Sequence, residues 1–207
     1  MNELDEIRFT VVSELFQQIY SERGTVLGPI WEYEVKVLNV YPSSLVDRFI
    51  NSGAILEFSG EIRTHGFDFR SGYLRRNQIL VKARGREEEA KLILKLKVQD
   101  STFKVTRKTE LSFGDVSIEE MVTRFDSIGL KGTFCDTKRR ETYSLSGVKF
   151  HLEIYPNLPR YLEIESESRE GVLRGLELCG YNLGTPNVVS WSTKRVFLEC
   201  RNGGKAC

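Results

Sequence analysis

Apolar and charged residues alternate with period two along much of the chain, and this pattern is typical of β-strands. The clearest case is 31–37, Trp-Glu-Tyr-Glu-Val-Lys-Val, in which bulky apolar side chains alternate with charged ones. Related patterns predict seven further strands, over residues 55–62, 78–84, 91–98, 103–113, 133–144, 147–155 and 160–166. Each of these strands is expected to have one apolar face and one polar face.

Helical signals are fewer and lie between the strands. Apolar residues at helical spacing predict a helix over 3–22, which we assign to an N-terminal helical extension, 1–30. Three shorter helices are predicted from Pro42 to Asn51, from Ser117 to Gly129, and over 168–179. The main domain is predicted over 31–200, with an irregular stretch from about 182 and a loose end at 201–207. The predicted fold class is therefore α+β.

Composition fits one ordinary globular domain. The chain has 207 residues, of which 40% are hydrophobic and 29% charged. Thirty Lys and Arg against 29 Asp and Glu leave a net charge of +1, which argues against nucleic-acid binding by bulk charge. No apolar run reaches the roughly 18 residues of a membrane span, and the first thirty residues lack a signal-peptide layout. We therefore expect a cytoplasmic protein without a membrane partner.

Several catalytic and metal-binding schemes find no support in the sequence. The four cysteines form no Cys-x-x-Cys pair and the chain has two histidines, so a zinc site built from these residues is not expected. Two histidines also leave little room for Ser-His or Cys-His catalysis. The glycine-rich phosphate loops of nucleotide-binding proteins are absent as well. Any chemistry must therefore rest on carboxylates, lysines and arginines.

Six predicted strands each carry two or more charges on one face, and the charges are sorted by sign. The first and last strands carry glutamates, whereas residues 75–108 hold eleven Lys or Arg and four Asp or Glu, a net charge of +7. The residues concerned are Glu32, Glu34, Lys36, Lys82, Arg84, Lys95, Lys97, Lys108, Glu110, Lys138, Arg140, Glu163 and Glu165. A merely solvated surface more often mixes the two signs.

These charges suggest a chemistry if the faces converge inside a closed antiparallel barrel. Crowded carboxylates repel one another by roughly 4 kcal/mol per pair at 4 Å, and a hard divalent cation relieves that repulsion. Lysines and arginines on other strands then need a multivalent anion, and a chain of phosphates suits them. This combination is typical of phosphoryl transfer.

The strand motifs, in their order, resemble the CYTH superfamily, the triphosphate tunnel metalloenzymes. Glu32-Tyr33-Glu34-Val35-Lys36 looks like its ExExK signature, and the later strands follow its pattern from residue 31 to about 180. The matching segments are Leu80-Val81-Lys82-Ala83-Arg84, Leu94-Lys95-Leu96-Lys97, Lys108-Thr109-Glu110, Lys138-Arg139-Arg140, Leu152-Glu153 and Tyr161-Leu162-Glu163-Ile164-Glu165.

The resemblance implies an eight-stranded antiparallel β-barrel, the triphosphate tunnel, with flanking helices and Mg²⁺ or Mn²⁺ as cofactor. It implies that Lys36 helps to activate the attacking water. The implied metal ligands are Glu32, Glu34, Glu163 and Glu165, with Glu110 and Glu153 as possible additions. The implied phosphate-binding residues are Lys82, Arg84, Lys95, Lys97, Lys108, Lys138 and Arg140.

Three functions stay open at this point. The first is metal-dependent hydrolysis of a triphosphate, with inorganic tripolyphosphate, thiamine triphosphate, ATP or an RNA 5′-triphosphate end as substrate. The second is a class IV adenylyl cyclase, which makes cyclic AMP and pyrophosphate from ATP. The third is a non-catalytic tunnel that binds a nucleotide or polyphosphate. We expect the N-terminal helix to cover the apolar outside of the barrel, with a tunnel mouth or a homodimer interface as the alternatives.

Overall fold

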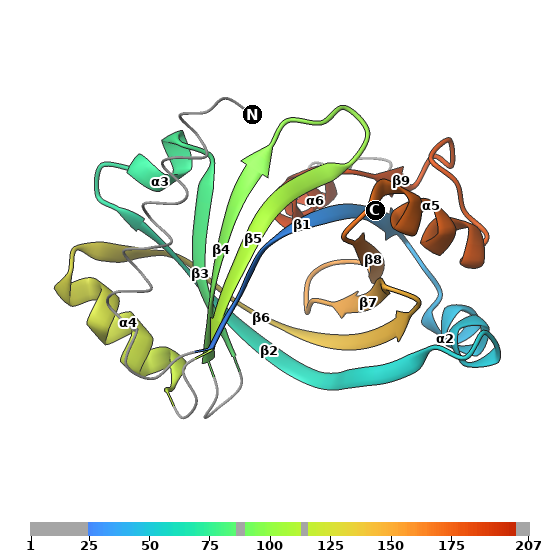
Figure 1. The fold of residues 1–207 in the computed structure, drawn as a ribbon, viewed down its shortest axis with the longest axis horizontal. Helices are drawn as coiled ribbons and strands as arrows, with labels where there is room; N and C mark the ends of the chain where they lie inside the picture. Colours follow the sequence, from blue (N-terminus) through green and yellow to red (C-terminus); the bar gives the residue numbers. More distant parts are fainter. Residues whose placement is uncertain (1–24, 86–89, 113–115, 202–207) are drawn as a thin grey trace. The chain divides into compact units, whose positions relative to one another are not determined.

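The computed structural model describes residues 25–85, 90–112 and 116–201. The helix predicted over 3–22 and nearly all of the loose end predicted at 201–207 lie outside the described residues. Nine strands form one sheet (Figure 1). Their bounds are β1 Thr25–Leu38, β2 Ile55–Phe69, β3 Ile79–Gly85, β4 Ala90–Val98, β5 Lys104–Ser112, β6 Leu130–Leu145, β7 Val148–Ile154, β8 Tyr161–Ser166 and β9 Val188–Val189.

The strand order confirms the predicted barrel. The order is β5-β4-β3-β2-β6-β7-β8-β1-β9, and β5 also pairs with β1. Strands β1 to β8 thus close into an eight-stranded antiparallel barrel, which leaves β9 as a short addition beside β1. Closure removes the free sheet edges that would otherwise invite pairing with another chain.

Among the described residues there are five helices: α2 Pro42–Asn51, α3 Tyr73–Arg76, α4 Ile118–Ser127, α5 Arg169–Leu178 and α6 Thr193–Arg201. Three of them, α2, α4 and α5, confirm the sequence prediction. The hydroxyls of Ser117 and Ser168 accept hydrogen bonds from the first turns of α4 and α5, as expected of N-caps. In the described part of the chain, no helix is both long and apolar enough to cross a bilayer.

The structure departs from the sequence prediction in several places. Strand β1 begins at Thr25 rather than at 31, so residues 25–30 are strand and not part of a helical extension. The short helix α3 was not predicted. The stretch after 182 is not irregular throughout, because α6 forms there and buries Val196 against a cluster with Tyr155 and Tyr161. Strand β2 continues to Phe69 rather than ending near 62, although Gly66 interrupts its pattern. The ring of Phe134 occupies the space that a side chain at Gly66 would need, so any other residue there would have to displace this ring.

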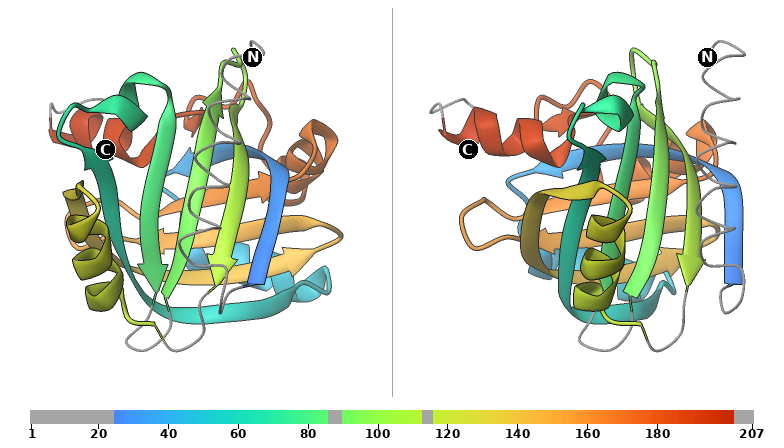
Figure 2. Two further views of the ribbon diagram at one scale, coloured as in Figure 1. Left: turned by 60° about the vertical axis from the view of Figure 1, so that its left-hand side comes forward. Right: turned by 90° about the vertical axis from the view of Figure 1, so that its left-hand side faces the viewer.

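Contacts divide the chain into two compact units, which are described separately. Unit 1 holds the described residues of 25–30, 62–99 and 106–137, and unit 2 holds 31–61, 100–105 and 138–201. In unit 1 the apolar faces of β3 and β4 pack against α4 (Figure 2). Phe125 of α4 meets Phe67 of β2 edge to face, with ring centroids 4.8 Å apart.

In unit 2, helix α5 covers the apolar face of β7 and β8. Gly175 allows the close approach, since a Cβ there would lie 2.7 Å from Ile164 and 2.9 Å from Val148. Phe49 of α2 packs on Phe150 of β7, with ring centroids 4.7 Å apart. Because these helices cover the apolar face, the polar face of the same strands lies on the other side of the sheet.

The turn between β4 and β5 is fixed by one carboxylate. Asp100 accepts hydrogen bonds from the backbone amides of Thr102 (2.9 Å) and Phe103 (2.8 Å). It also pairs with Arg169 at the start of α5, whose guanidinium lies 5.6 Å from the centre of the Phe103 ring. The amide of Phe103 is the main cause that lowers the pKa of Asp100, with smaller contributions from Thr102 and Arg169.

Asp100→Asn should lower the free energy of unfolding at pH 7 by about 1–2 kcal/mol, because charge-assisted hydrogen bonds are lost. The folded pKa lies below the unfolded value, so the carboxylate stabilises the fold at pH values above about 4, and this contribution fades as the pH falls through the folded pKa. Urea unfolding at pH 7 and pH 2.5 measures both differences.

The matched control is Asp126→Asn, which breaks an exposed pair with Lys131 and should change the free energy of unfolding by less than about 0.5 kcal/mol. An Asp100→Asn difference of equal size at the two pH values would contradict this account.

Candidate functional site

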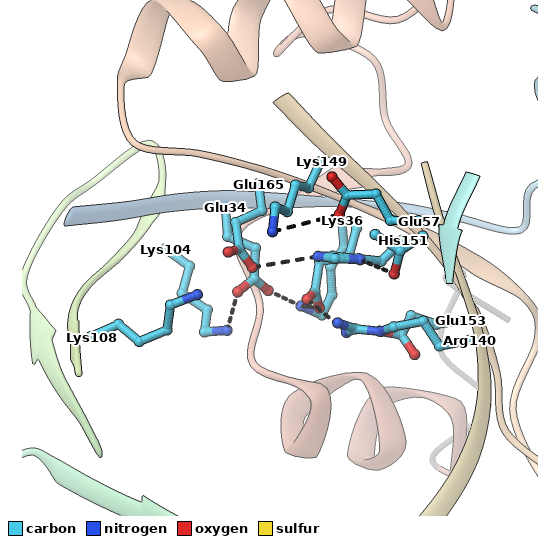
Figure 3. Close-up of polar contacts among 12 residues, drawn as sticks. Glu34, Lys36, Glu57, Lys104, Lys108, Arg140, Lys149, His151, Glu153 and Glu165 are labelled. Carbon is cyan, nitrogen blue, oxygen red and sulfur yellow. Dashed lines mark hydrogen bonds and ion pairs between the residues drawn. The ribbon is translucent and has the colours of Figure 1, made fainter. Parts of the chain in front are cut away.

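Register gathers the charged residues of unit 2 on one face of strands β6, β7, β8 and β1. Lys36 lies opposite Glu163 and Glu34 opposite Glu165 across the β1–β8 pair. His151 of β7 lies opposite Glu163 from the other side, and Arg140 of β6 lies opposite Glu153. Directly opposed residues share a face, so these side chains form one polar cluster (Figure 3).

Lys36 is one of the two fully enclosed charges of this cluster. It is 0% exposed, and its ammonium group donates to Glu163 at 2.7 Å and to Glu34. Burial alone lowers the pKa of Lys36, but the carboxylates of Glu163 and Glu34 outweigh it and raise the pKa above its ordinary value. Lys36 therefore stays charged at any physiological pH.

A second group of ion pairs centres on Glu153, which is also 0% exposed. Lys138 donates to its Oε1 at 2.8 Å, and Arg140 donates to the same oxygen. Arg140 also reaches Glu163 at 3.2 Å and so joins the two groups. Burial alone would raise the pKa of Glu153, but the positive charges of Arg140 and Lys138 outweigh burial. The pKa of this carboxyl therefore lies below its ordinary value.

Glu163 lies where the two groups meet. Lys36 binds its Oε2 and Arg140 its Oε1. Although burial favours the protonated carboxyl, Lys36, Arg140 and the more distant Lys104 and Lys138 hold the pKa of Glu163 well below its usual range. The carboxylate is therefore ionised.

His151 was not among the predicted site residues. Its Nδ1 lies 2.9 Å from the hydroxyl of Thr142, and its Nε2 lies 3.6 Å from Glu165. Burial and the nearby Arg140 lower its pKa, so the ring is neutral at pH 7. Ligand atoms of His151, Glu163 and Glu165 all lie within 4.8 Å of one another, which makes them the group of described residues suited to hold a metal ion.

Lys104 of β5 is a second addition, because the sequence analysis did not select it. Its ammonium group donates a hydrogen bond to Oε2 of Glu34, whereas Lys36 donates to Oε1. The charge pattern contained this signal, since Lys104 lies within the basic stretch 75–108. Glu32, predicted as a metal ligand, is buried on the same strand as Glu34.

The remaining predicted residues belong to unit 1. Strands β3 and β4 pair so that Lys82 and Arg84 share a face with Lys95 and Lys97. The opposite face carries the apolar core of unit 1, and Val81 is one of its members. On β5, Lys108 lies 3.4 Å from Glu110, so the two residues share a face as predicted. No described metal-binding group includes Glu110.

The cluster in unit 2 is nearly neutral as a whole. Four cations (Lys36, Lys104, Lys138 and Arg140) pair with three carboxylates (Glu34, Glu153 and Glu163), and Glu165 lies beside the neutral ring of His151. Removing so many charges from water costs several kcal/mol per ion, and such networks seldom stabilise a fold beyond what apolar packing would. Buried ionisable groups with strongly shifted pKa values are typical of functional sites.

Comparison with known proteins supports the fold. No family model and no curated protein matches the chain. A conserved hypothetical protein from Pyrococcus furiosus is 18% identical with a TM-score of 0.65; the match covers 80% of this chain and 99% of that one. A Vibrio parahaemolyticus protein, provisionally named an adenylate cyclase, is 11% identical with a TM-score of 0.70, over 83% and 99% of the two chains.

A third structure adds a named activity. A Hippeastrum protein, described by its name as an adenylyl cyclase candidate with dominant triphosphatase activity, is 15% identical with a TM-score of 0.53, over 84% and 96% of the chains. At these identities the likeness establishes the fold that this chain shares with all three proteins.

Glu153→Gln should lower the free energy of unfolding by about 3–5 kcal/mol, because Lys138 and Arg140 would stay buried without the charge that balances them. Urea denaturation at pH 7 measures this change. Glu57→Gln is the matched control: its pair with Lys149 is exposed and 3.7 Å long, so we expect a change under about 0.5 kcal/mol. Equal effects of the two substitutions would refute the assigned role of Glu153.

Proposed function

We propose that the protein hydrolyses a triphosphate with the help of a divalent metal ion. The observation that carries this proposal is the buried cluster of carboxylates, lysines and arginine on β1, β6, β7 and β8. The fold supports it, since one protein of that fold is named for a triphosphatase activity. The proposal places the chain with the triphosphate tunnel metalloenzymes that its motifs resemble.

The residues of the cluster suit a hard or borderline divalent ion. Glu163 and Glu165 offer carboxylate oxygens within 4.8 Å of each other, and both carboxylates were predicted as ligands. A bound ion would polarise the phosphoryl group. Glu34 and Glu153 lie outside this group of candidate ligands, and two cations engage each of them, so we assign them to positioning those cations.

Phosphate binding is assigned to the predicted cations. Arg140 and Lys138 belong to the cluster of unit 2, and the planar guanidinium of Arg140 can hold two phosphate oxygens at once. For unit 1 the assignment rests on the resemblance and on a shared basic face: Lys82, Arg84, Lys95, Lys97 and Lys108. A triphosphate has enough negative charge to engage several of these cations.

Lys36 is assigned to the attacking water. An ammonium group has three N–H donors, and Glu34 and Glu163 take two of them. The third can donate to the water and hold it in line with the terminal phosphorus. Orientation of this kind accounts for a large part of catalysis in phosphoryl transfer.

An adenylyl cyclase is the second candidate. The Vibrio protein of the same fold is provisionally named one, and it has a TM-score of 0.70. In that reaction the ribose 3′-hydroxyl attacks the α-phosphorus of ATP and pyrophosphate leaves. The same cations and carboxylates would serve both reactions, so the products distinguish them.

The test is a product assay on tripolyphosphate, thiamine triphosphate, ATP and an RNA 5′-triphosphate end, each with Mg²⁺ or Mn²⁺. We expect metal-dependent release of orthophosphate from at least one substrate. Glu165→Gln should reduce the rate at least about a hundredfold, since electrostatic groups in active sites contribute on that scale. Glu165 suits the test because its side chain is 14% exposed and its loss should perturb the fold little.

Glu57→Gln, which changes an exposed glutamate of the same unit, should keep the full rate. Cyclic AMP and pyrophosphate from ATP, without orthophosphate, would assign the cyclase instead. Tight binding of a triphosphate without turnover with either metal would favour a non-catalytic binding protein and would refute the proposed hydrolysis.

A further inference from the structure

We propose that Nε2 of His151 binds the divalent ion directly, beside Glu163 and Glu165, and that this nitrogen makes the site prefer Mn²⁺ to Mg²⁺. The inference rests on the proposed function for the presence of an ion. It goes further by naming a ligand that the sequence motifs did not select and by naming the metal.

The position of the ring supports direct binding. His151 is buried, and its Nε2 is turned toward Glu165 at 3.6 Å from Oε2. That distance exceeds the roughly 2.7–3.2 Å of an ordinary N–H···O hydrogen bond. Two ligand atoms at about 2.1 Å from one ion, at right angles, lie about 3.0 Å apart, so a small inward movement would let the two atoms share an ion.

The contacts of the ring fit the tautomer that a metal ligand needs. Nδ1 lies 2.9 Å from the hydroxyl of Thr142, and this hydroxyl can accept a hydrogen bond from Nδ1–H. The lone pair of the neutral ring then lies on Nε2, on the side of the two carboxylates. A histidine whose second nitrogen is fixed by a hydrogen bond is the usual arrangement of a metal-binding imidazole.

Glu163 can take part without giving up its cations. Lys36 and Arg140 each bind a different oxygen of Glu163. A carboxylate has about four lone-pair sites, so either oxygen can accept a hydrogen bond and ligate an ion at once. The three ligands therefore come from β7 and from two alternate positions of the neighbouring strand β8.

The ligand set decides the metal. Mg²⁺ is held mostly by oxygen ligands and water, whereas imidazole is a ligand of transition metals. Mn²⁺ accepts carboxylates as readily as Mg²⁺ does and also binds imidazole nitrogen. One nitrogen and two carboxylates thus favour Mn²⁺.

The experiment is electron spin-echo envelope modulation of Mn²⁺ bound to the full chain after removal of any affinity tag. The chain has only two histidines, so a ¹⁴N coupling has few possible sources. We expect a directly coordinated ¹⁴N in the wild type, its loss in His151→Gln, and Mn²⁺ binding about 10–100-fold weaker in that variant. Competition with Mg²⁺ should displace Mn²⁺ at a lower Mg²⁺ excess in His151→Gln than in the wild type.

His65→Gln is the matched control, since His65 belongs to unit 1 with its Nε2 3.2 Å from Cys135. It should keep both the coupling and the affinity, and circular dichroism checks that each variant folds. Bound Mn²⁺ without a ¹⁴N coupling in the wild type would overturn the inference, and this readout needs no variant. Orthophosphate release from the same preparation would then leave the proposed function standing. A ¹⁴N coupling without any turnover would overturn the proposed hydrolysis and leave His151 as a metal ligand.

Discussion

The shared carboxylate of Glu163 is the contact on which the site depends. Lys36 and Arg140 bind its two oxygens, and through them Glu34 and Glu153 join a single network. None of these ions could be buried alone at a small cost. A lone glutamate or lysine would shift its pKa until it lost its charge, and a lone arginine would keep its charge at a large desolvation cost. Together these groups keep one another ionised, so removing any member leaves its partners buried without a compensating charge.

The sheet makes this network possible by separating two environments. Along β8, Ile164 lies between Glu163 and Glu165, and it packs against α5 at Gly175. Along β8, neighbouring residues therefore alternate between the apolar packing under α5 and the charged face. A slip of one residue in register would exchange the two sets, and the cost of burying so many charges in the apolar core fixes the register.

Much of the fold could be predicted, because strand alternation and helix capping are local signals. The strand from Trp31 to Val37 and the cap at Ser117 needed only neighbouring residues to be identified. Helix α6 was missed since only Val196 is buried along it, which leaves a weak apolar stripe. The continuation of β2 through Gly66 follows from its pairing with β3, in which Gly66 lies opposite Lys82, and no local pattern could contain that pairing.

The sequence predicts which face of a strand each site residue lies on, but it does not predict which residues that side chain contacts. Parity alone places Glu163 and Glu165 on one side of β8, and the structure keeps them there. Which cation meets which carboxylate depends on strand order and register, and these are set by the closure of the whole sheet. His151 illustrates the limit: it lies two residues before Glu153 and so on the same face, yet its importance follows only from lying opposite Glu163. A polar residue that lies opposite a charged residue of a neighbouring strand gains its chemistry from the register, and the register depends on residues spread over the entire barrel.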